Sequence, residues 1–160
     1  MEVAIAAIGR LKAGPERELC ARYLDRARKI GSKLGLKGFD VHETPESRAA
    51  RPSERTAQEG QALLARIGGS DRLVCLDPAG DPTDSEDFAR NLSRDAAASV
   101  PRTIFVIGGA DGLDQLILGR ADRVLSFGRM IFSHQLARVL LAEQLYRATT
   151  MLSGHPYHRA

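Results

Sequence analysis

The chain has 160 residues, of which 43% are hydrophobic and 27% charged, and its formal net charge is +3. This composition is typical of one globular domain; it excludes a disordered chain, and the length excludes two domains with separate cores. The charge is unevenly spread, because nine Lys and Arg residues stand against three acids between Arg10 and Lys37. A nucleic-acid binder needs such a basic segment, and a solvated helix has the same composition.

The N-terminal apolar run at 3–8 spans six residues, which is too short for a signal peptide or a membrane-spanning helix. We therefore expect a cytoplasmic protein with no membrane contact. Cys20 and Cys75 are the only two cysteines, and neither has a Cys or His at ligand spacing. They predict buried free thiols and no metal site.

Apolar runs alternate with helix-length segments along the chain, beginning with a buried strand at 3–8 and a helix that opens at Pro15. The turn PAGDP at 78–82 is expected to end the third strand. Alternation of this kind indicates βαβ units, so we predict one α/β domain with a mostly parallel sheet and helices on both faces. The other strands are expected at 39–44, 72–77, 103–109 and 122–127, and the other helices at about 53–67, 84–98, 113–119 and 133–152.

The first helix is predicted to carry a basic stripe, because Arg22, Arg26, Lys29 and Lys33 recur at spacings of four, three and four residues. This stripe is a candidate RNA-binding face that would contact phosphates, and a plain solvated face explains it equally well. A different, apolar face of the same helix is expected to hold Leu19, Tyr23, Ala27, Ile30 and Leu34.

Three predicted strands end in loops that contain glycine: LDPAG at 76–80, IGGADG at 107–112 and SFGRMIFS at 126–133. Ligands of parallel sheets bind outside the carboxyl ends of the strands, so these loops are expected to meet at one site. One loop alone would indicate a tight turn, whereas three together favour a pocket lined by backbone N–H and C=O groups. IGGADG is not a dinucleotide fingerprint, and the chain has no P-loop motif. The pocket therefore suits an adenine edge and a ribose better than a triphosphate.

The last predicted helix, at 133–152, has apolar residues almost all round, which is too wide an arc for a helix that lies on a surface. It is either buried within the domain or half of a subunit interface, and a two-fold dimer is the more attractive reading for a small domain. Glu143 and Arg147 lie one turn apart on this helix, which predicts a simple ion pair.

Four blocks of the chain together resemble one family: VCLDPAG, FVIGGADGL, LSFGRMIFSHQLARVLLAEQLYRA and the terminal GHPYHRA. Their order and spacing are similar to those of the RlmH-type methyltransferases of the SPOUT class, and the resemblance runs the whole length. It implies a homodimer that uses S-adenosyl-L-methionine to methylate N3 of a pseudouridine in the helix 69 loop of 23S rRNA, within the assembled 70S ribosome. It also implies a single domain over 1–160, with a deep trefoil knot formed by roughly 73–160.

The resemblance also assigns roles to residues. The C-terminal tail could be a frayed terminus on composition alone, and the resemblance favours a tail that contacts the substrate beside the partner subunit's cofactor. Cofactor contacts are expected in the three glycine-containing loops, at Leu76, Gly108, Gly109, Gly128, Arg129, Met130, Ile131, Phe132 and Ser133. The catalytic set is expected to comprise His134, Arg147, Tyr157, His158 and Arg159.

Methyl transfer to a ring nitrogen needs alignment and a deprotonated N3, and nearby positive charge stabilises that anion. The Arg and His residues of the catalytic set would supply this charge. Each of these residues also has a purely structural explanation. His134 could simply support its loop, Arg147 could simply pair with Glu143, and an acid such as Asp77 could simply cap a turn.

Three positions depart from the family pattern: Ile131 stands where relatives commonly have Thr, Ser133 where they commonly have Pro, and Ala160 where a charged residue is usual. The missing hydroxyl at 131 removes a side-chain hydrogen bond, while backbone contacts to an adenine would survive. Two other functions remain open: a SPOUT enzyme that acts on another rRNA site or on tRNA, and a non-catalytic ribosome-binding module.

Overall fold

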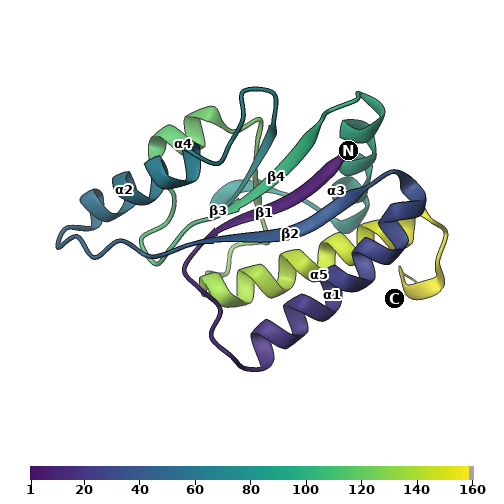
Figure 1. Cartoon of the computed structure of the whole chain (residues 1–160), viewed down its shortest axis with the longest axis horizontal. Helices are drawn as coiled ribbons and strands as arrows, with labels where there is room; N and C mark the ends of the chain where they lie inside the picture. The colour runs from purple at the N-terminus through teal and green to yellow at the C-terminus, as the bar shows by residue number, and fades with distance from the viewer. Residues whose placement is uncertain (159–160) are drawn as a thin grey trace.

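Five parallel strands form the centre of the computed structural model, which describes residues 1–158 (Figure 1). Their order across the sheet is β2-β1-β4-β3-β5, and each neighbouring pair is parallel. The predicted parallel α/β architecture is therefore confirmed. The strands are β1 (Glu2–Ile8), β2 (Lys37–Thr44), β3 (Arg72–Pro82), β4 (Arg102–Ile107) and β5 (Arg123–Ser126).

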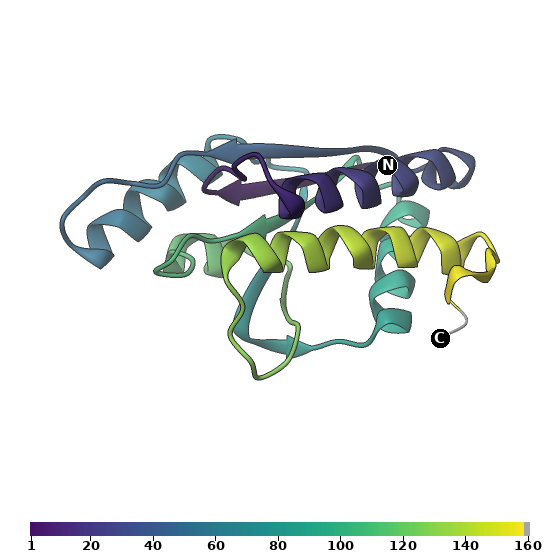
Figure 2. The same cartoon turned by 90° about the horizontal axis from the view of Figure 1, so that it is seen from below.

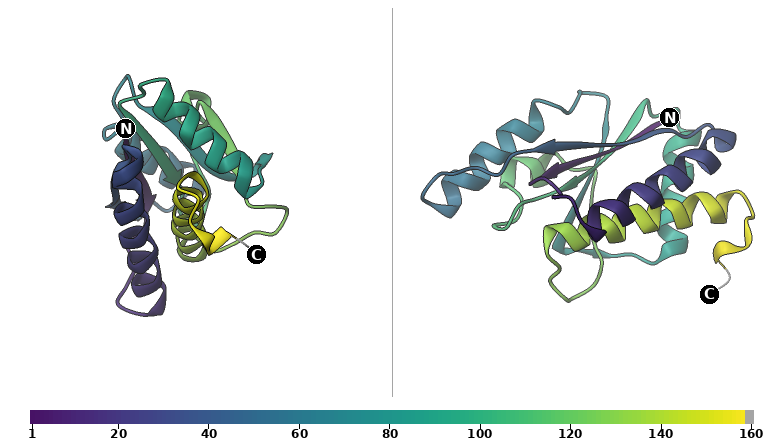
Figure 3. Two further views of the ribbon diagram at one scale, coloured as in Figure 1. Left: turned by 90° about the vertical axis from the view of Figure 1, so that its right-hand side faces the viewer. Right: turned by 60° about the horizontal axis from the view of Figure 1, so that its bottom comes forward.

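Helices cover both faces of this sheet, as the views in Figures 1 and 3 show. Because alternate residues of β1 pack into the two opposite layers, this strand reads as one continuous apolar run. Within the part of the chain that the structure describes, no helix is both long and apolar enough to cross a bilayer. One face carries α1 (Pro15–Gly31), α3 (Ser85–Ala97) and α5 (His134–Leu152), and the other carries α2 (Pro52–Leu64) and α4 (Gln115–Arg120). Two short 3-10 turns, η1 (Ser32–Leu34) and η2 (Pro156–His158), complete the fold.

Local chemistry explains where the helices begin. Asp84 caps α3 by accepting a hydrogen bond from the Asp87 amide at 2.7 Å, and Asp114 caps α4 by accepting from the Leu116 amide at 2.8 Å. The side chain of Ser133 accepts from the Leu136 amide at 3.3 Å and so caps α5. The serine that departs from the family pattern therefore has a local role in starting the last helix.

The expected end of the third strand at residue 77 is wrong, because β3 continues to Pro82 through a bulge. Leu76 and Asp81 both pair with Leu125 of β5, so the residues between them are extra in the register. A Cβ on Gly80 would lie 2.8 Å from the Val124 backbone, and only glycine therefore lets the returning chain approach β5 this closely. The first glycine-containing loop thus stays bonded to the sheet.

The predicted apolar face of α1 is rotated from the observed one. Ala27 is fully buried as expected, but Leu19, Tyr23, Ile30 and Leu34 are only half-buried. The helix packs against the sheet and also against α5, which runs beside it in Figures 1 and 3. Its most buried positions therefore include small residues, which allow this close packing. The fully buried positions are Cys20, Leu24, Ala27 and Gly31.

Both cysteines are buried free thiols, as predicted. Burial raises the pKa of the Cys20 thiol, with the nearby Arg138 guanidinium acting in the opposite direction. Burial also raises the pKa of Cys75, to about 12. Neither thiol is therefore poised as a nucleophile at neutral pH.

Within one chain α5 is buried chiefly between α1 and α3 and against the sheet (Figure 2). This arrangement accounts for most of its apolar arc without a partner subunit, although Leu136 remains 48% exposed. Arg138 is the polar centre of this packing, because its side chain is fully buried. It forms an ion pair with Glu43 of β2 and donates to the backbone oxygens of Ile8 at 3.3 Å and Gly9 at 2.9 Å.

Replacing Arg138 by Met should lower the free energy of unfolding by about 3–5 kcal/mol, because it leaves the carboxylate of Glu43 without its buried partner. The double variant Arg138→Met/Glu43→Leu should be more stable than Arg138→Met, since the unpaired charge is then gone. Urea unfolding followed by circular dichroism measures both, with Arg90→Met on the exposed surface of α3 as control. An equal loss in the single and the double variant would contradict this account.

Candidate functional site

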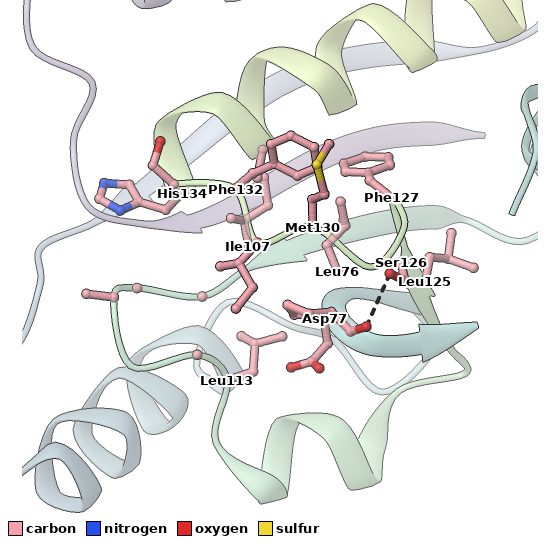
Figure 4. A pocket seen from close by; sticks show the side chains of 18 of the residues that line it. Leu76, Asp77, Ile107, Leu113, Leu125, Ser126, Phe127, Met130, Phe132 and His134 are labelled. Carbon is pink, nitrogen blue, oxygen red and sulfur yellow. Dashed lines mark hydrogen bonds between the residues drawn. The ribbon is translucent and has the colours of Figure 1, made fainter. Parts of the chain in front are cut away.

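A cavity of about 460 Å³ lies at the carboxyl ends of β3, β4 and β5 (Figure 4). The three glycine-containing loops meet there, as the parallel strand order predicts. Figure 4 shows Leu76, Ile107 and Leu113, from two strands and the loop between β4 and α4, converging on this space. Of the residues expected to contact a cofactor, those that line the cavity are Leu76, Gly108, Gly109, Gly128, Met130, Ile131, Phe132 and Ser133.

The loop after β4 is tight enough to require glycine. A Cβ on Gly108 would lie 2.6 Å from the carbonyl oxygen of Gly112, and Gly112 itself has a φ of +84°. The Gly112 amide donates to the Gly109 oxygen at 3.2 Å and closes the turn. The loop therefore presents backbone rather than side chains to this side of the cavity.

The loop between β5 and α5 is anchored at one end and exposed in the middle. Ser126 Oγ accepts from the Gly128 amide at 3.1 Å and lies 3.3 Å from the Pro78 oxygen, so it ties this loop to the bulge of β3. Met130 and Ile131 line the cavity, yet they are 72% and 84% exposed. Arg129 is exposed and does not line the cavity, in contrast to its neighbours in the loop.

The lining is apolar and rich in backbone, with very little charge. Among the described residues that line the cavity, none is Lys or Arg, and the ionisable ones are Asp77 and His134. Asp77 Oδ1 accepts from the Ala79 amide at 2.8 Å, which is the turn-capping role that the sequence left open. Over residues 1–158 no group of three His, Cys, Asp or Glu residues could hold a metal ion. Such a cavity suits a nucleoside, and its described lining has no cationic Lys or Arg side chain to balance the negative charge of a triphosphate.

His134 lies at the side of the cavity, at the first position of α5 (Figure 4). Its Nε2 is 3.7 Å from Glu46 Oε1, and a Cβ on Gly9 would lie 3.0 Å from the same nitrogen. The histidine therefore packs against the loops that follow β1 and β2. This placement agrees with a supporting role and leaves the ring beside any ligand in the cavity.

The tail residue Tyr157 belongs to a second cluster, on the C-terminal half of α5. Its hydroxyl lies 3.2 Å from Glu143 Oε1, and its ring centroid is 4.4 Å from that of Tyr146. Arg147 binds the same carboxylate at 2.9 Å, as the i,i+4 spacing predicts, and its guanidinium lies 5.3 Å from the Tyr157 ring centroid. Burial, followed by the neighbouring hydroxyl of Tyr23 and by Glu143, raises the pKa of Tyr157 to about 12.

The structure does not bring this cluster to the cavity within one chain. The hydrogen bonds and ring contacts of Tyr157 join it to residues of α5 and the tail that do not line the cavity. Arg147 follows His134 by thirteen positions on the helix, which is about 20 Å along the axis. His158 ends η2, and Arg159 and Ala160 lie outside the described residues.

The basic stripe is exposed along its whole length, at Arg22, Arg26 and Lys29 of α1 and at Lys33, which lies in η1 because the helix ends at Gly31. Lys29 pairs with Asp25 at 2.8 Å, and the Arg26 guanidinium lies 5.8 Å from the Tyr146 ring centroid. The stripe therefore borders the tail cluster through Tyr146, which the sequence did not indicate. Its role as an RNA-binding face stays a prediction.

Sequence reasoning missed apolar lining residues that come from outside the glycine motifs, such as Leu113, Leu125 and Ala137. It also missed the packing of α2 against the glycine loop, which Arg55 and Glu59 mediate. The available signal was the spacing of four residues between Arg55 and Glu59 on one predicted helix.

Comparison with known proteins agrees with this geometry. The family model described as "Predicted SPOUT methyltransferase" matches residues 1–158. Proteins named "Ribosomal RNA large subunit methyltransferase H" from Xanthobacter autotrophicus and Bradyrhizobium sp. are each 49% identical to the chain, and one from Rhodopseudomonas palustris is 51% identical. Each of these alignments covers 100% of both chains over 160 residues. The predicted resemblance is thereby confirmed.

Substituting Gly108 by Ala should destabilise the protein by about 1–3 kcal/mol, because the new methyl group meets the backbone oxygen of Gly112 and the turn must open. The matched control is Gly119→Ala on α4, where a Cβ meets nothing within 4 Å. That change should stabilise the protein by about 0.4–1 kcal/mol. Thermal melts of both variants test the turn geometry, and a Gly108→Ala protein as stable as the wild type would contradict it.

Proposed function

Because the chain belongs to the SPOUT methyltransferase family, we propose that it transfers a methyl group from S-adenosyl-L-methionine to large-subunit ribosomal RNA. The observation that carries this proposal is the cavity at the carboxyl edge of β3, β4 and β5. Its volume of about 460 Å³ falls within the usual range for small-molecule sites, and no Lys or Arg lines it in the described part of the chain. When bound, S-adenosylmethionine supplies a methyl group on a positively charged sulfur.

The residues present fit this cofactor. Apolar side chains such as Leu76 and Leu113 offer a surface for an adenine ring, and the Gly108–Gly109 backbone offers hydrogen-bonding groups without side-chain bulk. A cavity without cationic side chains also avoids repulsion of the sulfonium charge, and Asp77 adds an acid to the wall. Leu76, Gly108, Gly109, Gly128 and residues 130–133 are the proposed cofactor-binding residues. Arg129, which was expected among them, is exposed and does not line the cavity.

The proposed substrate is a pseudouridine of 23S rRNA, methylated at N3 in the assembled 70S ribosome. The names of the relatives support large-subunit rRNA, and the small chain supports a substrate presented by a large preformed surface. The basic stripe of α1 would contact phosphates, which positions the protein without reading sequence. A cytoplasmic location follows from this substrate.

The protein's own task at the reacting atom is to stabilise a deprotonated N3 and to hold the base in line. Arg147, Arg159 and the histidines His134 and His158 are the proposed sources of positive charge, and Tyr157 would stack on the base. A sulfonium donor would leave as a neutral thioether, so no general acid would be required of the chain, and the proton of N3 would pass to solvent. Alignment and charge are therefore the two contributions of the site.

A homodimer would unite the two clusters that one chain keeps apart. In this proposal, the tail and Arg147 of one subunit complete the cavity of its partner, with the exposed Leu136, Met130 and Ile131 near the junction. A deep trefoil knot over roughly 73–160 is the further family feature that we expect in the single domain.

A deletion strain tests the activity directly. Mass spectrometry of its 23S rRNA should show one missing methyl group, restored by the wild-type gene and not by Gly109→Val. Valine has no room at this position, since even a Cβ lies 3.0 Å from Glu59 Oε2 and from Ile8 Cγ2. A loss on tRNA or at another rRNA site would favour the alternative SPOUT enzyme, and unchanged RNA would favour a non-catalytic ribosome-binding module.

Mixed dimers test the shared site. A chain that lacks residues 155–160 and a chain with Gly109→Val should each be inactive, because one lacks the tail and the other the cavity. After unfolding and refolding together, random pairing should restore about a quarter of the wild-type activity, since half the dimers then hold one complete site. Size-exclusion chromatography checks that dimers form. A mixture that dimerises and stays inactive would show that each tail serves its own chain.

A further inference from the structure

Two side chains of α2, Arg55 and Glu59, each contact both the segment 45–51 and the glycine loop that lines the cavity. They lie four residues apart and therefore on the same face of the helix. Neither lines the cavity itself. We refer to this pair as the α2 bracket.

Arg55 forms the outer half of the bracket. Its Nε and Nη2 donate to the two carboxylate oxygens of Asp111 at 2.7 and 3.1 Å, which is a two-pronged pair at the tip of the glycine loop. Its Nη1 donates to the backbone oxygens of Ala49 and Ala50, both at 3.1 Å. The Arg55 and Asp111 side chains are only 27% and 28% exposed, so solvent screens the pair less than a surface ion pair.

Glu59 forms the inner half and is buried, with 7% exposure. Its Oε1 accepts from the Ser47 amide at 2.8 Å, while Oε2 lies behind Gly109, at 3.0 Å from where a Cβ would be. Burial raises the pKa of Glu59, and the hydrogen bond from Ser47 opposes that shift. The carboxyl group therefore fills the space that a larger residue at 109 would occupy.

The segment 45–51 extends the connection to the opposite wall, because Glu46 lies 3.7 Å from His134 at the start of α5. Hydrogen bonds thus link the glycine loop, α2 and the segment 45–51, and this segment in turn packs against the first residue of α5. α2 lies beside α4, on the face of the sheet opposite α1, α3 and α5 (Figure 1).

We propose that Arg55 and Glu59 are positioning residues, which hold the glycine loop and the start of α5 at the spacing that the cofactor requires. This inference rests on the proposed function, because it takes S-adenosylmethionine as the occupant of the cavity. The bracket acts on cofactor affinity through the position of Gly108 and Gly109 and has no part in the chemistry at the target base.

Isothermal titration of the full-length protein with S-adenosylmethionine tests the outer half. Arg55→Gln and Asp111→Asn should each raise Kd about tenfold, and the double variant should be no weaker than the weaker single one, because both changes remove the same pair. Arg51→Gln is the matched control, because Arg51 is exposed and, among the residues that the structure describes, its side chain pairs with Glu54 alone, at 3.8 Å. It should bind as the wild type does.

The inner half has its own conservative variant. Glu59→Gln keeps an oxygen that accepts from Ser47 and should bind nearly as well as the wild type, whereas Glu59→Ala should bind about tenfold more weakly. Glu54→Gln, on the exposed part of the same helix, is the control. In methylation assays with ribosomes, the KM for S-adenosylmethionine should rise in the affected variants while kcat at saturating cofactor stays near the wild-type value.

These measurements separate positioning from stability. A merely structural role would lower the melting temperature and leave Kd unchanged below the melt, and that result in Arg55→Gln and Glu59→Ala would overturn the proposal. Should Arg55→Gln fail to fold, Asp111→Asn removes the same ion pair. Should Glu59→Ala fail to fold, the double variant Glu59→Gln/Ser47→Pro removes the same hydrogen bond, because proline at 47 has no amide proton to donate. Wild-type protein that does not bind S-adenosylmethionine would instead refute the proposed function, and so the two failures are distinguishable.

Discussion

The buried ion pair between Arg138 and Glu43 is the constraint on which the rest of the molecule depends. A guanidinium with no solvent exposure is costly unless its charge is matched. Here Nη1 pairs with the Glu43 carboxylate and Nη2 donates to the oxygens of Ile8 and Gly9, while Nε has no hydrogen-bond partner within residues 1–158. Glu43 also accepts from the Leu11 amide at 2.8 Å. The pair therefore joins α5 to the ends of β1 and β2 and to the loop between β1 and α1.

That junction determines where the cavity can form. His134 lies one turn before Arg138 on α5, and Ser133, which caps the helix, is the last residue of the third loop of the cavity. Because Arg138 is bonded to the carboxyl ends of β1 and β2, the start of α5 and the end of that loop have little conformational freedom. A charged residue in the core thus specifies the position of a site that itself contains almost no charge.

The sequence predicted most of the fold because its signals are local. Apolar runs marked the strands, and the pair Asp84 and Ser85, either of which could cap a helix, marked the start of α3. The rule that parallel strands bind ligands at their carboxyl ends brought three loops together. The bulge in β3 was not predictable, since it depends on Gly80 fitting against β5, more than forty residues away in the chain. Arg138 and Glu43 are still further apart, and the only hint was a lone arginine in an otherwise apolar part of the last helix.

The site could be predicted in part for the same reason. Glycine loops are visible in a sequence, but the support behind them is not, because Arg55 meets Asp111 only after α2 has packed on the sheet. The tail shows the opposite case. Its composition suggested contact with a base, whereas its position against Tyr146 and Glu143 depends on how the chain folds back along α5. A single chain therefore holds both halves of the predicted site without joining them.

The neutral lining of the cavity has a consequence for how the protein responds to ionic strength. Under the proposed function, backbone groups and apolar side chains would hold a nucleoside with little help from Lys or Arg, so added salt would have little to screen there. Contacts between exposed basic residues and RNA phosphates release counterions and weaken steeply as salt rises. Cofactor binding and RNA binding would therefore differ in their response to ionic strength, and salt that releases the protein from RNA would leave cofactor binding in the cavity largely unchanged.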